Sequence, residues 1–319
     1  MTYATKIGAV VIGRNEGERL LACIRSLQGL DRVVYVDSGS TDGSVEAARE
    51  LGADVVLLDT ETPFTAARSR NAGLAKLTEN HEITLVQFVD GDCEVQPAWI
   101  ETAAAFLESR PDVAAVCGRR REIAPESSIY NRLIDMEWAT PVGEAKSCGG
   151  DALMRVTAVK KAGGFDPGFI AGEEPELCVR LRAVGWKIWR LDAEMTLHDA
   201  KITRFGQWWK RTRRAGHAYA EGAATHGAKP ERHNVAQTRR ALLWGLGIPL
   251  AAIVFGSITL WGWALLLLWP IQIFRVYARG EPFTRAFFLT LGKVPEAFGI
   301  TEYTISRIRG RRNKLIEYK

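Results

Sequence analysis

Two aspartates, Asp90 and Asp92, follow an apolar segment with only Gly91 between them, in the sequence FVDGDCEV at 88–95. Two like charges at this spacing repel each other, and the end of a purely structural strand does not need them. Hard divalent cations such as Mn²⁺ and Mg²⁺ take oxygen ligands and are usually held by one or two carboxylates together with substrate phosphates. A surface Asp-Gly turn is the commoner use of such a tripeptide taken alone. The spacing thus indicates either a turn or a metal site.

The segments around this motif alternate between two kinds of hydrophobic pattern. Apolar runs of strand length alternate with segments in which apolar residues recur at helical spacing. Strands are expected at 7–13, 33–36, 54–59 and 83–90, and helices at 16–29, 45–52 and 66–77. The alternation predicts βαβ units, a parallel sheet and a doubly wound, Rossmann-like α/β domain. In such sheets ligands bind beyond the carboxyl ends of the strands.

This rule gives several polar residues a common location. Asp37 and Asp90 each stand directly after an apolar strand, so both are expected on one rim of the sheet. Arg68, Arg70 and Asn71 lie between them in the sequence. Two acids, a possible metal and arginines on one rim suit an anionic nucleotide.

Two other classes of nucleotide enzyme are disfavoured. The first strand is followed by GRNEGE rather than by the GxGxxG pattern of dinucleotide-binding proteins. A nucleotidyltransferase is also disfavoured, because no glycine-rich loop with Arg or Lys opens the chain.

The cysteines and the N-terminus indicate a reducing compartment for the first half of the chain. The 319 residues include five cysteines, an odd number without a CxxC pair. This pattern disfavours a disulfide framework and a structural zinc site. The N-terminus lacks the basic and then apolar pattern of a signal peptide, so export of this half is not expected.

The charge is distributed unevenly along the chain. Residues 1–200 hold 22 Lys and Arg and 31 Asp and Glu, a net charge of −9, whereas residues 201–319 hold 20 and 6, a net charge of +14. Such a basic half could bind nucleic acid or an anionic membrane surface. The 34 residues at 241–274 include no charged residue, a composition typical of membrane-spanning segments. Membrane lipids, and no nucleic acid, are therefore the expected partners.

The uncharged run is too long for one straight span. A helix of 34 residues would be about 51 Å long, against a hydrocarbon core of about 30 Å. Pro249, the FGS at 255–257 and Gly262 offer break points, so we predict a hairpin of two short helices at 241–256 and 258–274.

The flanks of the run favour an even number of spans. Arg239 and Arg240 precede it and Arg275 and Arg279 follow it, which places both ends on the cytoplasmic side. A single tilted span and a shallow re-entrant pair remain alternatives because each half is short. A buried hairpin of a soluble protein is the remaining interpretation.

Six short motifs follow one another in a characteristic order. They are VVIGRNE (10–16), VDSGSTDGS (36–44), ARSRNAGL (67–74), VDGDCEVQP (89–97), GGDALMR (149–155) and GGFDPGFIAGEEPELCVRLRAVG (163–185). Together they resemble the family 2 glycosyltransferases over roughly residues 6–215. The resemblance implies the GT-A fold, with its mixed sheet, a nucleotide-diphospho sugar as donor and association with a membrane.

The resemblance also implies roles for individual residues. Asp37 would contact the base of the donor and Arg70 its nucleotide. Asp90 would lie by the ribose and the metal, and Asp92 would bind the metal, Mn²⁺ or Mg²⁺. The sequence departs from the family at Ser38, where a second acid is common.

The acidic pair on the acceptor side is Glu173 and Glu174, where the family usually has Glu-Asp. Pro175 suits the first position of a helix, which would make Glu174 its N-cap. Glu174 could merely cap the helix, but a longer side chain held outside the helix could also project into a cleft. We predict that Glu174 is the general base with Glu173 as its neighbour, and Asp166 and Asp151 are the alternatives.

Two features near residue 200 have more than one interpretation. His198 follows the strand-like KIWRL and either completes the metal site, touches the diphosphate or is structural. The segment RFGQWWKRTRRAGHAYAEG at 204–222 combines tryptophans with arginines. It suits an amphipathic helix at a membrane interface, and its guanidinium groups also suit a lipid diphosphate.

These observations predict a catalytic domain at 1–215, a basic linker or interfacial helix at 216–240, the hairpin at 241–274 and a basic amphipathic segment at 275–319. The predicted function is inverting transfer from a nucleotide sugar, preferably a UDP-sugar, to a lipid-linked or cell-surface glycan acceptor at the cytoplasmic face of the inner membrane. Addition of a single sugar is preferred, because QWWKRT at 207–212 only approximates the QxxRW motif of processive relatives. A nucleotide-sugar-binding protein without turnover is the main alternative, and a transport or scaffold protein is disfavoured because one hairpin is too little for a transporter.

Overall fold

The chain forms two compact units in the computed structural model, residues 1–203 and residues 204–319. The structure describes residues 5–59 and 61–310. The two units divide between residues 203 and 204. The expected domain boundary at residue 215 falls inside helix α8 (Phe205–His226). Residues 311–319 of the expected C-terminal segment lie outside the described residues.

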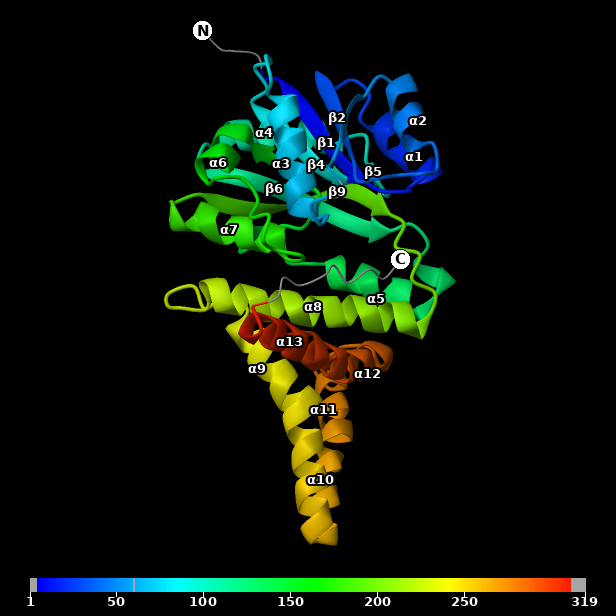
Figure 1. The fold of residues 1–319 in the computed structure, drawn as a ribbon, viewed down its shortest axis with the longest axis vertical. Coiled ribbons are helices and arrows are strands. Elements are labelled where there is room, and N and C mark those ends of the chain that lie inside the picture. The colour runs from blue at the N-terminus through cyan, green and yellow to red at the C-terminus, as the bar shows by residue number, and fades with distance from the viewer. Residues whose placement is uncertain (1–4, 60, 311–319) are drawn as a thin grey trace. The chain divides into compact units, whose positions relative to one another are not determined.

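The first unit alternates strands and helices, as the hydrophobic pattern predicts (Figure 1). Its elements are β1 (Ile7–Gly13), α1 (Glu18–Ser26), β2 (Arg32–Asp37), α2 (Ser44–Glu50), β3 (Asp54–Leu57), α3 (Ala66–Leu77), β4 (Leu85–Asp90), β5 (Cys93–Val95), α4 (Trp99–Ser109), β6 (Val113–Glu122), η1 (Pro125–Ser127), α5 (Ile129–Trp138), β7 (Gly143–Ala145), β8 (Ala152–Arg155), α6 (Val156–Lys161), α7 (Glu173–Ala183) and β9 (Lys187–His198).

One mixed sheet organises this unit. Among the described residues it has nine strands in the order β3-β2-β1-β4-β8-β6-β9-β5, and β7 pairs with β9. The strands β3, β2, β1 and β4 are parallel, which confirms the βαβ alternation, whereas β8 pairs antiparallel to both β4 and β6. The expected mixed α/β fold class is thereby confirmed: the first four strands are parallel, β8 interrupts this arrangement, and β6 pairs in parallel with β9 beyond it.

The register of the parallel strands brings two of the predicted acids to one rim. In the pairing of β1 with its neighbours, Gly13 lies opposite Asp37 and Ile12 lies opposite Asp90. The carboxyl ends of β2 and β4 therefore flank the end of β1. Helix α3 approaches this sheet closely at Gly73, where an added Cβ would lie 2.3 Å from a methyl group of Val10. A small residue at this point lets α3 lie against β1 and β2 and positions the residues at its N-terminal end.

The second unit is helical (Figure 1). Its elements are α8, already defined, α9 (Val235–Leu242), the π-helical turn η2 (Leu243–Gly247), α10 (Ile248–Ile258), the 3₁₀ segment η3 (Leu260–Leu267), α11 (Leu268–Tyr277), α12 (Phe283–Leu291) and α13 (Lys293–Ile308).

Close backbone approach at glycines holds α8 against α13. A Cβ on Gly216 of α8 would lie 2.0 Å from the carbonyl oxygen of Glu296, and a Cβ on Gly299 of α13 would lie 2.0 Å from the carbonyl oxygen of Arg213. Small residues permit such close packing between helices, an arrangement frequent in membranes. Arg213 also pairs with Glu302 of α13 at 2.8 Å.

The uncharged run forms a hairpin of two continuous helical stretches. They cover 235–258 and 260–277, and both are long and apolar enough to cross a membrane by length and composition. The bend between the two stretches is at Thr259, whose backbone is extended. Pro249, one of the predicted break points, does not break the helix. Pro249 lies near the start of α10, directly after the π-helical turn Leu243–Gly247, and this wider turn accommodates the proline inside the continuous helical stretch.

The hairpin is therefore longer than predicted. At about 1.5 Å per residue in α-helix and about 2.0 Å in the 3₁₀ segment, the two stretches measure roughly 36 and 31 Å, close to a hydrocarbon core of about 30 Å. Large apolar side chains on them are exposed, including Leu260 at 86% and Trp261 at 85%. This exposure disfavours the buried hairpin of a soluble protein.

Candidate active site

Two arginines hold the carboxylate of Asp90 at the carboxyl rim of the sheet. Arg70 Nη2, from α3, lies 2.9 Å from Asp90 Oδ1, and Arg120 Nη2, from β6, lies 3.3 Å from Asp90 Oδ2. Arg120 also contacts Asp151 at 3.3 Å, and its guanidinium lies over the ring of Trp138 at 4.9 Å. The two guanidinium groups balance the clustered carboxylates and fix the orientation of Asp90.

Arg70 connects Asp90 to the predicted acidic pair. Its Nη1 lies 2.7 Å from Glu173 Oε1, and its Nη2 lies 3.0 Å from Glu174 Oε1. A Cβ on Gly150 would lie only 2.6 Å from Arg70 Nη2, so this glycine keeps the space around the guanidinium open. The structure thus brings together Arg70, Asp90, Glu173 and Glu174, from three separate parts of the sequence.

The acidic pair lies within the first turn of α7 and does not precede it. The helix begins at Glu173, and its N-cap is Gly172, which has a left-handed backbone with φ of 81°. The prediction that Glu174 is the N-cap was therefore wrong. Pro175 is tolerated at the third helical position because the first N–H groups of a helix have no intrahelical partner.

The two glutamates differ in their surroundings. The side chain of Glu173 is 5% exposed, whereas that of Glu174 is 15% exposed. Burial raises the pKa of Glu174 to about 7, with a further increase from the neighbouring Glu173, against the opposing effect of Arg70. A carboxyl with this pKa can exchange a proton near neutral pH.

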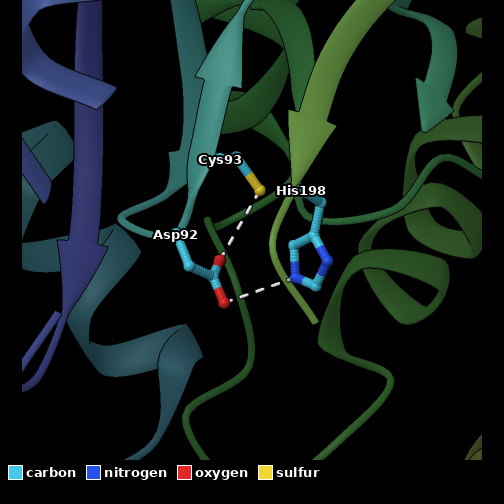
Figure 2. Close-up of side chains that lie close together, drawn as sticks. All are labelled: Asp92, Cys93 and His198. Atoms are coloured by element: carbon cyan, nitrogen blue, oxygen red, sulfur yellow. Dashed lines mark hydrogen bonds and ion pairs between the residues drawn. The ribbon is translucent and has the colours of Figure 1, made fainter. Parts of the chain in front are cut away.

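Asp92 and His198 face each other across the ends of β4 and β9 (Figure 2). Asp92 Oδ2 lies 3.3 Å from His198 Nε2, and both residues are buried. The antiparallel pairing of β5 with β9 places Cys93 opposite His198, and Cys93 Sγ lies 3.6 Å from Asp92 Oδ1. Asp90 belongs to a second group, with Cys93 and Asp151.

These residues fit a divalent cation. Neighbouring ligands of Mg²⁺, bound at about 2.1 Å in an octahedron, are roughly 3 Å apart, close to the 3.3 Å between Asp92 and His198. Burial, with Arg120 nearby, lowers the pKa of His198 and keeps the imidazole neutral, as a ligand must be. Burial raises the pKa of Cys93 well above its usual value, so it remains a thiol. A neutral thiol is a poor ligand for a hard cation, which leaves Asp92 and His198 as the donor pair.

Asp37 closes the turn that follows β2. Its Oδ2 accepts hydrogen bonds from the N–H groups of Gly39 and Ser40 at 2.8 and 2.9 Å, and its Oδ1 accepts one from the hydroxyl of Tyr35 at 2.8 Å. The residue lines a pocket of about 480 Å³, whose other walls come from the turn, α2 and the end of β3. Leu57, which is 62% exposed, contributes an apolar wall to this pocket.

The two alternative candidates for a base have structural partners. Asp151 is buried, accepts a hydrogen bond from Thr196 at 2.7 Å and pairs with Arg120. Asp166 accepts a hydrogen bond from the N–H of Gly168 in its own turn. Asp151 therefore orients Arg120, and the contacts of Asp166 are local.

The sequence interpretation missed three residues of this region, Arg120, Glu122 and Trp138. Arg120 and Glu122 end the long strand β6, and Trp138 ends α5. The signal that could have found the first two is the charged run GRRRE at 118–122, which directly follows an apolar segment. This is the same pattern that singled out Asp37 and Asp90.

Comparison with known proteins gives one family. Residues 9–160 match the model described as Glycosyl transferase family 2. The chain is 28% identical over 233 residues to the pre-mycofactocin glycosyltransferase of Mycobacterium tuberculosis, covering 69% of this chain and 48% of that protein. It is 26% identical over 237 residues to the succinoglycan biosynthesis protein ExoA of Rhizobium meliloti, covering 71% and 68%. The matched region thus spans about half the length of the first relative.

Two solved structures share the fold. The mannosyltransferase PcManGT from Pyrobaculum calidifontis, in complex with GDP-Man and Mn²⁺, has a TM-score of 0.66 at 19% identity and covers 94% of this chain and 88% of that one. Glucosyl-3-phosphoglycerate synthase from Mycobacterium tuberculosis, in complex with Mn²⁺, UDP and glucosyl-3-phosphoglycerate, has a TM-score of 0.51 at 17% identity, covering 70% and 81%. At these identities the likeness concerns the fold, which is of the GT-A type.

Proposed function

We propose that this chain, which belongs to glycosyl transferase family 2, transfers a sugar from a nucleotide-diphospho sugar to an acceptor hydroxyl. One observation carries the proposal. Arg70 joins Asp90, on the rim where donors bind in this fold class, to Glu173 and Glu174, which supply a carboxylate base. Donor-side and acceptor-side groups thereby meet at one guanidinium.

Glu174 is the general base in this proposal. An inverting transfer needs a group that takes the proton of the acceptor hydroxyl as its oxygen attacks the sugar, and no protein nucleophile is required. Glu174 is more exposed than Glu173, and its raised pKa suits a base that works near neutral pH. Glu173, more deeply buried and paired with Arg70 at 2.7 Å, holds the guanidinium in place.

Asp92 and His198 are the residues that would hold Mn²⁺ or Mg²⁺, with Asp90 close to the ribose and to the metal. A cation bound there neutralises negative charge on the departing nucleoside diphosphate. Arg70 would add a fixed positive charge on the same side of the donor. The two charged groups would share the stabilisation of the leaving group.

The turn after β2 would hold the base of the donor. Asp37 Oδ2 already accepts two backbone hydrogen bonds, whereas Oδ1 accepts one and retains acceptor capacity, which suits the imino hydrogen of uracil; Leu57 offers an apolar surface. A UDP-sugar is therefore the donor that we favour. The acceptor that we favour is a lipid-linked or cell-surface glycan, because an exposed apolar hairpin follows the catalytic unit in the sequence.

The raised pKa of Glu174 predicts a dependence of transfer on pH. Its carboxyl acts as a base only when ionised, so kcat should rise with pH through about 7 and fall about tenfold per unit well below this value. The kcat of the wild-type protein between pH 5.5 and 8.5, with donor affinity measured at each pH, checks this. A kcat that does not change from pH 5.5 to 8 would contradict Glu174 as the base.

The hairpin predicts integral attachment to the membrane, with both ends in the cytoplasm. The protein should stay with membranes after washing at high salt and leave only with detergent. A surface binder would be released, because its attachment, about 1 kcal/mol per basic residue, weakens as salt screens the charges. Fractionation at low and high salt distinguishes these outcomes.

Topology tests the same proposal more sharply. Single cysteines at Ala228 and at Lys319 should both resist an impermeant thiol reagent in intact cells and both react after permeabilisation. The five native cysteines are buried and should give little background. Labelling of the Lys319 position alone in intact cells would show a single span and overturn the hairpin.

A further inference from the structure

The ring of His198 has a second nitrogen that the metal proposal leaves unused. Its Nε2 faces Asp92, and its Nδ1 is buried and has no hydrogen-bond partner among the described residues (Figure 2). The rings of Trp138 and His198 pack edge to face, with centroids 4.8 Å apart and planes at 87°, and this packing restricts rotation of the imidazole. His198 itself is 7% exposed, so water does not readily form a hydrogen bond with Nδ1.

The carboxylate of Glu122 lies close to this nitrogen. In the pairing of β6 with β9, Glu122 lies opposite His198, and its Oε2 is 3.7 Å from Nδ1. A shift of less than 1 Å would close a hydrogen bond, since such bonds measure about 2.7–3.2 Å. The side chain of Glu122 is fully buried beside the ring.

The other contacts of Glu122 fix it as an acceptor. Its Oε1 accepts hydrogen bonds from the side-chain amide of Asn131 at 3.1 Å and from the N–H of Ala124 at 3.4 Å, and its Oε2 accepts one from the N–H of Ala200 at 3.0 Å. All three partners are donors, which suits an ionised carboxylate. Glu122 is therefore held in place, with free acceptor capacity directed at the ring.

We propose that Glu122 is a positioning residue for the metal site, which keeps the proton of His198 on Nδ1 and so presents the lone pair of Nε2 to the cation beside Asp92. The inference rests on the proposed function, in which His198 is a metal ligand. Ligating histidines commonly donate their second N–H to a carboxylate, and loss of that partner typically costs 10–100-fold in metal affinity. Glu122 would not itself touch the metal or the substrates.

The substitution Glu122→Gln tests the role of the acceptor with little change of shape. Ala200 and Nδ1 share Oε2, whereas Asn131 faces Oε1, so either orientation of the amide places an NH₂ group against a donor. If the NH₂ group faces Nδ1, it favours the tautomer with the proton on Nε2, which cannot ligate. If it faces Asn131, the amide retains an oxygen toward the ring but loses the charge. Both orientations weaken the site.

The experiment measures binding of Mn²⁺ alone to the full-length protein in detergent, from the electron paramagnetic resonance signal of the free ion. Glu122→Gln should weaken the affinity about 10–100-fold. Glu194→Gln is the matched control, because Glu194 lies on the same strand pair but is exposed and paired with Arg121. The control should bind Mn²⁺ like the wild type. Melting temperatures without metal show whether each variant is folded.

A second readout is made on the wild type, and a variant serves only to assign the signal. With saturating Mg²⁺, which is diamagnetic, nitrogen NMR of labelled histidine in the wild type should show His198 with its proton on Nδ1, assigned by comparison with His198→Asn. A proton on Nε2 in this state would overturn the proposal. So would a folded Glu122→Gln variant that binds Mn²⁺ as tightly as the wild type, since Glu122 would then have only a structural role. Failure of the wild type to bind Mn²⁺ would instead overturn the metal site of the proposed function.

Discussion

Replacing Asp92 with Asn should abolish the metal-dependent binding of a nucleoside diphosphate and reduce transfer by about 100-fold or more. The carboxamide has nearly the same shape but lacks the charge that a hard cation requires. Loss of the charge stabilisation that the metal provides is worth several kcal/mol, and each 1.36 kcal/mol is tenfold in rate. Calorimetric titration with UDP, with and without Mn²⁺, measures the binding, and release of nucleoside diphosphate measures the transfer.

The control for this variant lies two residues further along the chain. Glu94 is an exposed acid on β5, and Glu94→Gln should leave binding and transfer unchanged. Because Asp92 is buried, the melting temperature of Asp92→Asn must also be compared with that of the wild type. A folded Asp92→Asn variant with unchanged Mn²⁺-dependent affinity for UDP would rule Asp92 out as a metal ligand.

Replacing Glu174 with Gln should leave donor affinity intact and reduce kcat by about 10²–10⁴-fold, because an amide cannot take the proton of the acceptor hydroxyl. The guanidinium of Arg70 keeps two other carboxylate partners, Asp90 and Glu173, so the donor side should remain ordered. Donor affinity from titration and kcat from product formation separate these effects.

The neighbouring acid provides the discriminating comparison. Glu173→Gln should lower kcat less than Glu174→Gln does and should also raise the KM for the donor, since this residue acts by holding Arg70. If Glu174→Gln turns over within a few-fold of the wild type while Glu173→Gln or Asp166→Asn is inactive, the base has been assigned to the wrong carboxylate.

The local pattern of the sequence predicts one half of the site well. The strands β2 and β4 are short apolar runs that end in Asp37 and Asp90, and the rule for parallel strands is enough to bring both acids to one rim. Helix α3 covers the predicted residues 66–77, which places Arg70 near its start. Local periodicity and chain topology suffice here because each element pairs with its close neighbours in sequence.

The other half depends on pairings between segments far apart in the sequence. Glu122 meets His198 only because β6 pairs with β9, through a register that contains irregularities. No local signal fixes such a register, since a slip of one residue would turn the side chains to the other face. For the same reason, the contact between Arg120 and Asp90 could not be predicted.

The positions of two prolines within their helices also differ from those predicted from the sequence. Pro175 was expected to begin its helix and Pro249 to break one, yet both lie inside first turns. Pro175 is tolerated because the N–H groups of the first turn of α7 have no intrahelical acceptor, whereas Pro249 directly follows a π-helical turn inside a continuous helical stretch. The presence of a proline alone does not show which residue of the first turn it occupies.

The most direct test of the proposed function is turnover of nucleotide sugars by the detergent-solubilised protein. A panel of UDP-sugars and GDP-sugars is incubated with membrane lipid extract and Mn²⁺, and release of nucleoside diphosphate is followed with and without EDTA. We predict release from at least one UDP-sugar that requires the metal and is lost in both Asp92→Asn and Glu174→Gln. Tight, metal-dependent binding of a nucleotide sugar without any release across the panel would contradict the account and identify a binding protein without turnover.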